Sequence, residues 1–169
     1  MHYTVVKAET SADFAQIEAL AQKIWHCTYD ALIGPEQVDY MVQKFQSQTA
    51  LQRDVEENGY EYSMAFDAGR LIGYCGVHPE DRNFVFLSKV YVDPDYQKMG
   101  IAKSMVFSYV KKYADLGFKK MWLTVNKGNE NAIAAYLKLG FVRSGELLTD
   151  IGNGYVMDDY TMELNLTQS

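Results

Sequence analysis

The residues with the clearest chemical potential lie in the segment Val90–Ala102, where an apolar run ends and a helix is expected to begin. A turn rich in Asp and Pro follows the apolar run, and the hexapeptide QKMGIA (97–102) opens the helix. The first amides of a helix have no partner within it and carry a partial positive charge, so they bind phosphate groups. Gly100 lets the backbone approach a ligand closely, and Lys98 and Lys103 add positive charge. The segment predicts a phosphate-binding turn; the alternative is an ordinary strand–turn–helix connection.

Two common phosphate-binding fingerprints do not fit this segment. The dinucleotide fingerprint needs three glycines spaced G-x-G-x-x-G, and the hexapeptide has one. A Walker loop needs Gly-Lys followed by Ser or Thr, and that sequence does not occur in the chain. The predicted turn therefore belongs to another class of phosphate site.

The composition restricts the classes to which the chain can belong. Its 169 residues favour one domain, and 48% hydrophobic with 22% charged residues is typical of a globular protein. A net charge of −6 argues against a broad nucleic-acid-binding face but allows a local anion site. The 13 tyrosines exceed what a core needs and suit a cleft wall, because each ring is apolar with a polar tip.

The cysteines and the termini exclude further classes. Cys27 and Cys75 lie in unrelated contexts, so we expect two buried free thiols, no disulfide framework and no metal site. The chain starts without the basic and apolar regions of a signal peptide. No apolar run reaches the ~18 residues that a membrane span requires. We therefore expect a soluble, cytoplasmic protein that binds neither membranes nor nucleic acid.

The hydrophobic periodicity predicts one α/β (α+β) domain. The apolar stripes and turn residues predict a mixed, mostly antiparallel sheet of about seven strands flanked by helices. The strand 83–92 is almost continuously apolar, so we expect it to be central and buried on both faces. Gly73 and Gly76 indicate close approach by another backbone or a ligand. Strands are expected at 3–7, 62–66, 71–77, 83–92, 119–125, 142–150 and 155–166, and helices at 11–25, 35–45, 48–58, 100–116 and 129–139.

Two motifs, in order and on the expected elements, resemble those of the GNAT superfamily of N-acetyltransferases. The first is Q-x-x-G-x-A at 97–102, and the second is N-x-x-A-x-x-x-Y-x-K-x-G-F at 129–141. The resemblance covers residues 61–166 well and the N-terminal helices only loosely. It implies a single N-acetyltransferase domain over 1–169, in which 1–59 is an acceptor-side arm and 61–166 is the cofactor-binding core.

The resemblance also implies acetyl-CoA as the donor and direct attack by a primary amine. The pantetheine arm would lie in a gap beside the backbone of residues 90–92, and the pyrophosphate on the amides of 98–103. Tyr136 would protonate the leaving thiolate, as a phenol aimed at developing negative charge; otherwise it is a core tyrosine. Asn129 would contact the cofactor, cap the helix, or do both. The cofactor-binding residues implied are Val90, Tyr91, Val92, Gln97, Lys98, Met99, Gly100, Ile101, Ala102, Lys103, Asn126, Asn129, Tyr136 and Lys138.

The general base is not evident. Many family members carry a base on the long central strand, but residues 83–92 contain no Asp, Glu or His, and Lys89 and Tyr91 are the ionisable residues there. We therefore expect a water chain to relay the proton, with His78, Glu80 or Asp159 as its end. Each of these three could equally be a structural or surface residue.

The acceptor groove is expected opposite the cofactor, between the first two helices and the last two strands. An acidic and aromatic cleft would attract a cation. The candidates are Trp25, Tyr29, Tyr40, Asp150, Tyr155, Asp158 and Asp159. Local similarity at 35–41 and 157–162 resembles bacterial spermidine/spermine-type acetyltransferases and suggests a polyamine acceptor. A protein or peptide amine, or a CoA-binding sensor with little turnover, are the alternatives, and a homodimer is left open.

Overall fold

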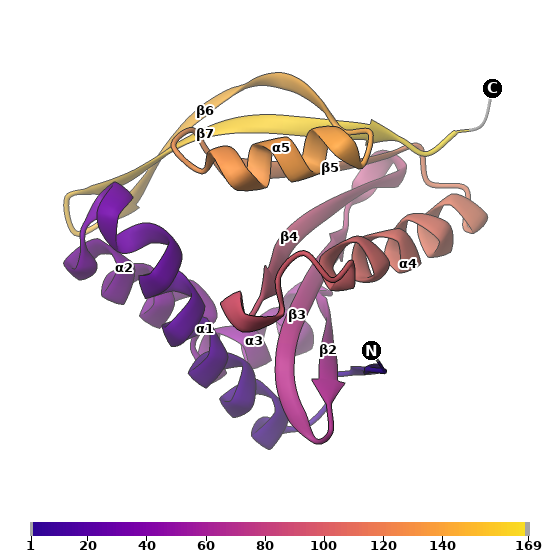
Figure 1. Cartoon of the computed structure of the whole chain (residues 1–169). Coiled ribbons are helices and arrows are strands. Elements are labelled where there is room, and N and C mark those ends of the chain that lie inside the picture. Colours follow the sequence, from indigo (N-terminus) through magenta and orange to yellow (C-terminus); the bar gives the residue numbers. More distant parts are fainter. Residues whose placement is uncertain (1, 168–169) are drawn as a thin grey trace.

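The computed structural model describes residues 2–167, which form one seven-stranded sheet in the order β1-β2-β3-β4-β5-β7-β6 (Figure 1). The predicted succession of helices and strands is confirmed, and so is the mostly antiparallel sheet, in which only β4 and β5 run parallel. The strands are β1 (Thr4–Lys7), β2 (Glu61–Asp67), β3 (Arg70–Pro79), β4 (Phe84–Val92), β5 (Lys120–Asn126), β6 (Val142–Gly152) and β7 (Tyr155–Asn165). The helices are α1 (Ser11–Ile33), α2 (Pro35–Met41), η1 (Val42–Gln46), α3 (Gln48–Asn58), α4 (Ile101–Asp115) and α5 (Glu130–Lys138).

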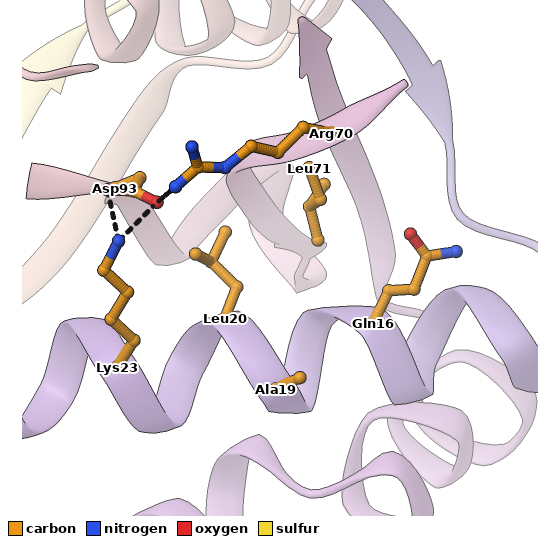
Figure 2. Close-up of a pocket in the computed structure, with 7 residues that line it drawn as sticks. All are labelled: Gln16, Ala19, Leu20, Lys23, Arg70, Leu71 and Asp93. Atoms are coloured by element: carbon orange, nitrogen blue, oxygen red, sulfur yellow. Dashed lines mark hydrogen bonds and ion pairs between the residues drawn. The ribbon is translucent and has the colours of Figure 1, made fainter. Parts of the chain in front are cut away.

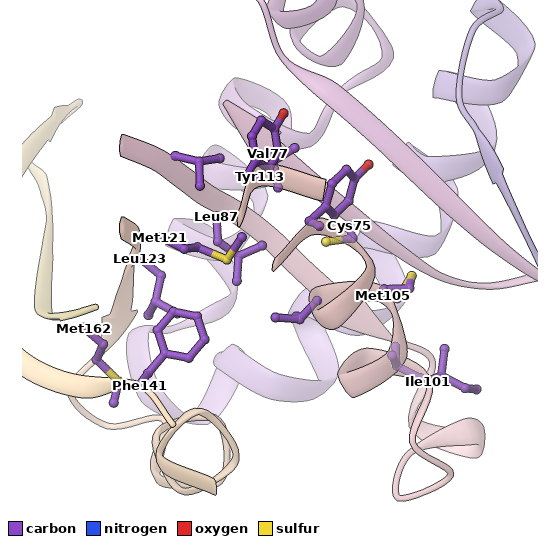
Figure 3. Close-up of a cluster of buried hydrophobic side chains, with 14 of the residues drawn as sticks. Cys75, Val77, Leu87, Ile101, Met105, Tyr113, Met121, Leu123, Phe141 and Met162 are labelled. Atoms are coloured by element: carbon purple, nitrogen blue, oxygen red, sulfur yellow. The ribbon is translucent and has the colours of Figure 1, made fainter. Parts of the chain in front are cut away.

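Helices cover both faces of the sheet, and each face has its own hydrophobic core. Helices α4 and α5 pack on one face over a cluster that includes Met105, Met121 and Phe141 (Figure 3). Helices α1, α2 and α3 pack on the other face over Phe14, Tyr62 and further apolar side chains. These three helices lie mainly over the β2–β4 side, and α2 also contacts the end of the β6–β7 hairpin (Figure 1). No helix in the described residues is both long and apolar enough to cross a membrane.

Strands β4 and β5 pair only where they start. Their parallel ladder comprises Phe84 with Lys120, Val85 with Met121, and Phe86 with Trp122, and no β4–β5 pair follows. The register between β3 and β4 also shifts here, because Gly76 pairs with Lys89 while Val77 pairs with Leu87. Ser88 is therefore the extra residue of a β-bulge, a feature that bends a strand and interrupts pairing. The sheet thus opens between β4 and β5 beyond the bulge (Figure 1).

The first helix is longer than its sequence predicts. We expected it to end near Trp25, but it continues to Ile33 and ends at Gly34, whose φ of 88° suits glycine. The reason is that the buried stripe continues through Trp25 to Tyr29, four residues apart, with no Gly or Pro before Gly34. The predicted capping box at its start is confirmed, since Thr10 and Asp13 each bond the other's backbone N–H.

Three smaller expectations about burial need correction. Cys27 is exposed and only Cys75 is buried. Strand β4 is not buried on both faces, because Phe86 and Ser88 are only half-buried. Gly76 makes room for a side chain rather than for a backbone or ligand, since a Cβ there would meet the Tyr62 ring. These differences all follow from where α1–α3 sit, which the sequence pattern does not specify.

Candidate active site

The turn before α4 presents free backbone amides. Gly100 sits at the helix start with φ 79° and no side chain caps the helix, and Lys98 has φ 64°. The first backbone bond joins the Ser104 N–H to the Gly100 carbonyl oxygen at 3.0 Å, so the N–H groups of residues 101–103 precede it. Residues 97–100 are exposed. The predicted phosphate-binding turn therefore has the geometry of an anion site.

Asp93 holds the turn before α4 in place. It is 1% exposed, and its carboxylate accepts a bond from the Asp95 N–H at 3.0 Å. Lys23 of α1 and Arg70 of β3 also donate to it, at 3.0 Å and 3.1 Å (Figure 2). Burial opposes ionisation, but these donors hold the pKa of Asp93 below its ordinary value. The three residues border a pocket of about 300 Å³ between α1 and β3 (Figure 2).

The opening between β4 and β5 begins next to this turn. Residues 90–92 pair with β3 on one side and lie past the last β4–β5 pair on the other. Val90 packs into the α4-side core with Val92, while Tyr91 lies on the opposite face against Trp25 at 5.6 Å between ring centroids. The Gln97 side chain donates to the Val92 carbonyl oxygen at 3.5 Å. The unpaired edge of β4 leads to the uncapped amides at the start of α4. This arrangement suits a ligand with an extended chain that ends in phosphate groups.

Tyr136 lies at the opening, on α5. Its ring packs edge-on against Phe141 at 5.7 Å, and the side chain joins the α4-side core. Burial raises the pKa of its hydroxyl, as do the neighbouring Tyr29 and Cys75. The phenol therefore stays protonated across the neutral range and can serve as a proton donor. Lys138, two residues later, is exposed.

Two asparagines border the opening from the β5–α5 connection. The Asn129 oxygen caps α5 by accepting from the Ala132 N–H at 3.3 Å, and its amide donates to the Tyr29 hydroxyl at 3.1 Å. Asn129 thus caps the helix and also links it to α1. The Asn126 oxygen accepts from the Gly128 N–H at 2.8 Å, which leaves the Asn126 amide nitrogen for other partners.

The predicted acceptor side includes one buried carboxylate and two buried aromatic rings. Asp159 is 4% exposed and pairs across strands with Asn126. Burial, then repulsion by Asp158, raises the pKa of Asp159 to about 6. Tyr29, whose pKa is raised by burial and further by the Asp159 charge, packs against Trp25 at 4.7 Å. Trp25 and Tyr29 are 6% and 7% exposed, so other side chains cover most of each ring.

Three of the other predicted acceptor residues, Tyr40, Asp150 and Tyr155, lie together at the turn of the β6–β7 hairpin. Tyr40 donates to the Ile151 carbonyl oxygen at 2.6 Å and packs against Tyr155 at 5.2 Å, which joins α2 to the β6–β7 hairpin. Asp150 accepts from the Gly152 N–H at 2.9 Å and is exposed. Asp158 pairs with Lys127 at 2.9 Å and is also exposed. These contacts hold the residues in the fold, and their role in acceptor binding stays a prediction.

The candidate ends of a proton relay differ in their surroundings. The buried Nδ1 of His78 has no hydrogen-bond partner among the described residues, and the ring stacks on Tyr60 at 4.5 Å. Glu80 accepts a hydrogen bond from the Trp122 indole N–H at 2.5 Å, and this contact fixes the Glu80 side chain against β5. Two further clusters of titratable groups were not predicted as part of the site. One is His26, held between Asp30 at 2.7 Å and Asp39 at 2.8 Å, and the other surrounds the buried Lys89.

Comparison with known proteins identifies the family. Residues 17–141 match the model of the Acetyltransferase (GNAT) family. An uncharacterised N-acetyltransferase of Mycobacterium tuberculosis is 28% identical over 152 residues, covering 88% of this chain and 96% of that protein.

Solved structures show the same fold. The PaiA N-acetyltransferase of Thermoplasma acidophilum, in complex with coenzyme A, superposes with a TM-score of 0.78 at 21% identity, covering 98% of this chain and 99% of that one. A spermidine N-acetyltransferase chimera that includes the Vibrio cholerae enzyme has a TM-score of 0.70 at 20% identity, covering 98% and 96%. The spermidine/spermine-type subgroup is not singled out by these similarities. The chain belongs to the GNAT family and is an acetyl-CoA-dependent N-acetyltransferase.

Proposed function

We propose that this enzyme acetylates a small cationic amine, such as a polyamine, by direct attack in a ternary complex. The observation that carries the proposal is the buried Asp159 carboxylate, which faces Tyr29 beside the opening between β4 and β5. A desolvated carboxylate attracts a cation more strongly than an exposed one, because water screens it less. The aromatic rings nearby add cation–π attraction.

The donor-side residues would bind acetyl-CoA largely through the backbone. The amides of residues 98–103 would hold the pyrophosphate, and the edge of residues 90–92 would hold the pantetheine arm. Asn126, Asn129 and Lys138 would line the same opening. When bound, acetyl-CoA supplies an acetyl group activated as a thioester. The protein contributes orientation, which can be worth about 7–11 kcal/mol in favourable cases.

Tyr136 would supply a proton at the donor side. It lies at the opening, is half-buried, and remains protonated in the neutral range because burial raises its pKa. A phenol O–H in a site with little water stabilises negative charge that develops on a leaving thiolate. We therefore assign it the proton-donor role, opposite to the acceptor wall formed by Asp159 and Tyr29.

A peptide amine is the second candidate acceptor. The acceptor face continues past Asp159 along β7 to a shallow hollow of about 240 Å³ at the start of β4 and β5. Side chains alternate along a strand, so Thr161 and Glu163 share the face of Asp159. Trp122 and Phe84 border the hollow with them. This open extension would accommodate residues that follow a reactive N-terminal amine.

A panel of amines distinguishes these candidates. Thiol release from acetyl-CoA would be measured with spermidine, putrescine, n-propylamine and a hexapeptide with a free N-terminus. We expect kcat/KM to be at least tenfold higher for the polyamines than for n-propylamine, a difference of about 1.4 kcal/mol. Peptide turnover above that of polyamines would favour the second candidate. Acetyl-CoA binding without thiol release for any amine would favour a CoA-binding sensor.

A further inference from the structure

A lysine is buried in β4, at the position along the strand where the sheet opens. Lys89 is 7% exposed, and its Nζ donates to the Tyr62 hydroxyl at 2.9 Å and to the Ser88 Oγ at 3.3 Å. Burying an ammonium group is costly unless it is paired, and a lysine that is not needed for packing is rarely found there. The proposed function gives Lys89 no task, so its retention in the core needs another explanation.

The contacts of Lys89 continue to the protein surface. The Tyr62 hydroxyl donates in turn to the Asp54 Oδ2 at 2.8 Å, and the Asp54 side chain is 21% exposed on α3. The Asp54 Oδ2 lies 3.8 Å from the Lys89 Nζ, so the carboxylate also acts on the lysine through space. We call this hydrogen-bonded series the Lys89 chain; in order from the sheet opening to the surface it consists of Ser88, Lys89, Tyr62 and Asp54.

The inner end of the Lys89 chain lies beside the reaction site proposed above. Ser88 is the bulge residue and is half-buried on the acceptor face, just past the last β4–β5 pair. It stands four residues before Val92, about 13 Å along the strand at 3.3 Å per residue. An arm held along residues 90–92, with its phosphates at the start of α4, therefore points its reacting end toward the bulge.

The reaction needs a route for a proton. An amine that arrives as an ammonium ion loses two protons when it becomes an amide, and the leaving thiolate takes only one. The second proton must reach water, but the acceptor wall of Asp159 and Tyr29 is buried. Strand β4 carries no Asp, Glu or His that could accept it.

We propose that the Lys89 chain conducts this proton from the acceptor amine to the surface. The ammonium group gives a proton to Ser88 Oγ while the serine proton passes to neutral Lys89. Lys89 then gives a proton to the Tyr62 hydroxyl, whose own proton passes to Asp54. Asp54 releases it to water, and the chain returns to its starting state with no net change. The two outer hydrogen bonds already point in this direction, since Lys89 donates to Tyr62 and Tyr62 donates to Asp54. The inner bond runs from the Lys89 ammonium to Ser88 Oγ, and it reverses when Lys89 is neutral, because the amine lone pair then accepts the serine O–H.

The electrostatics around Lys89 allow it to lose a proton near neutral pH. Burial lowers the pKa of Lys89 to about 8, while the Asp54 charge opposes this and keeps the pKa from falling further. The groups that face it are Tyr62 from β2, Asp54 from α3, Ser88 from β4, and the Tyr60 ring at 5.7 Å. Burial raises the pKa of Tyr62, so the tyrosine passes protons on without ionising itself.

The first test does not depend on turnover. The ¹⁵N resonance of the Lys89 Nζ, assigned by its loss in Lys89→Met, would be titrated by NMR in the full-length protein with coenzyme A present. We expect a midpoint near pH 8, and a lower midpoint in Asp54→Asn, which removes the opposing charge. A titration midpoint above pH 10, or a midpoint that is the same in Asp54→Asn as in the wild type, would overturn the proposal.

The second test compares two acceptors with the same variants. Spermidine is charged at pH 7, whereas 2,2,2-trifluoroethylamine is already neutral and needs no proton removed before it attacks. We expect Tyr62→Phe and Asp54→Asn to lower kcat with spermidine at least tenfold, but with trifluoroethylamine less than threefold. Tyr74→Phe is the matched control, because Tyr74 is also buried on this face and donates to Gln46 at 3.0 Å, outside the chain.

The outcomes separate this inference from the proposed function on which it rests. Equal losses with both amines mean that the chain has only a structural role, and the inference fails. If spermidine is not acetylated by the wild type, the proposed acceptor class is wrong, and the NMR titration alone decides whether Lys89 exchanges protons. Imidazole buffer can replace a missing proton acceptor. If the rate of Lys89→Met rises with imidazole concentration and the wild-type rate does not, the result further supports proton transfer through the Lys89 chain.

Discussion

The proposed donor side and the proposed acceptor side of this enzyme are built in different ways. The donor side uses the backbone: uncapped amides at the start of α4 and the strand edge of residues 90–92. The acceptor side uses side chains from distant parts of the chain, with Tyr29 on α1, Lys89 on β4 and Asp159 on β7. A backbone site requires a short, continuous sequence with glycine at a defined place. A side-chain site requires only that the fold bring its members together. Variants on each side test this division.

Tyr136 is the one donor-side group whose side chain should control chemistry. Replacing Tyr136 by Phe removes the O–H and leaves the packing against Phe141 intact. We expect kcat to fall by about 100-fold, within the range for loss of a proton donor. The Kd for acetyl-CoA, measured by calorimetry, should stay within twofold.

The matched control for this variant is Tyr113→Phe, which removes a hydroxyl from another buried tyrosine of the same core. Its kcat should not change by more than twofold. If Tyr136→Phe retained full kcat, Tyr136 would be a core residue and nothing more.

Gly100 tests whether the donor side depends on the backbone amides. A Cβ at Gly100 meets no atom within 4 Å, and the same is true at Gly117, which follows α4; both have φ near 80°. Asp tolerates this backbone region better than most residues. A carboxylate at Gly100 would repel the pyrophosphate, so we expect Gly100→Asp to weaken acetyl-CoA binding by about 30-fold, or ~2 kcal/mol.

Gly117→Asp carries the same change in charge and backbone strain at the other end of the helix. Its Kd for acetyl-CoA should remain within twofold of the wild type. Equal Kd values for the two variants would show that the start of α4 does not hold the phosphates.

Asp159 tests whether the acceptor side depends on a side-chain charge. We expect Asp159→Asn to raise KM for spermidine by about tenfold, or ~1.4 kcal/mol, without a change in the Kd for acetyl-CoA. In the wild type, KM should rise as the pH falls through about 6, where Asp159 becomes protonated. Asp158→Asn is the control: it keeps Asp159 and removes its repulsion, so this rise in KM should move to lower pH.

The same carboxylate links the pH to stability. Because the pKa of Asp159 is raised by folding, its neutral form stabilises the protein below the unfolded-state pKa, and this contribution is lost as the pH rises through about 6. Asp159→Asn should therefore raise the free energy of unfolding at pH 8 by about 1–2 kcal/mol. Urea denaturation at pH 8 and pH 5 would measure this, and a gain that is larger at pH 5 would contradict the assignment.

The division also explains what could be predicted from the sequence. The Q-x-x-G-x-A turn and the order of elements follow from local signals, the gap beside residues 90–92 follows from the family resemblance, and the structure has all three. The separation of Tyr40 and Asp150 from Asp159 could not be foreseen, because it depends on how the β6–β7 hairpin meets α2. Lys89 appeared as one ionisable residue in an apolar strand. Its partner Asp54 lies on α3, 35 positions earlier, and no local pattern connects the two.

Asp93 joins the donor-side turn before α4 to Lys23 of α1, the helix that also carries Tyr29 of the proposed acceptor side. Its replacement should have a small effect, and only on the donor side. Asp93→Asn keeps an acceptor for the Asp95 N–H but loses the charge that pairs with Lys23 and Arg70. Both cations are about half exposed, so solvent reduces their contribution, and we expect the free energy of unfolding to fall by about 1 kcal/mol. Since the pKa of Asp93 is lowered by folding, this difference from the wild type should be complete above about pH 4, and it should be lost as the pH falls through the lowered pKa. A looser turn should weaken acetyl-CoA binding by about threefold, or ~0.7 kcal/mol, with KM for the amine unchanged.

Asp95→Asn is the matched control, because Asp95 meets the same cations at 3.4 Å and 3.8 Å from an exposed position. A rise in KM for the amine with Asp93→Asn would mean that Lys23 and α1 transmit the change, and that the two sides are coupled through this ion pair.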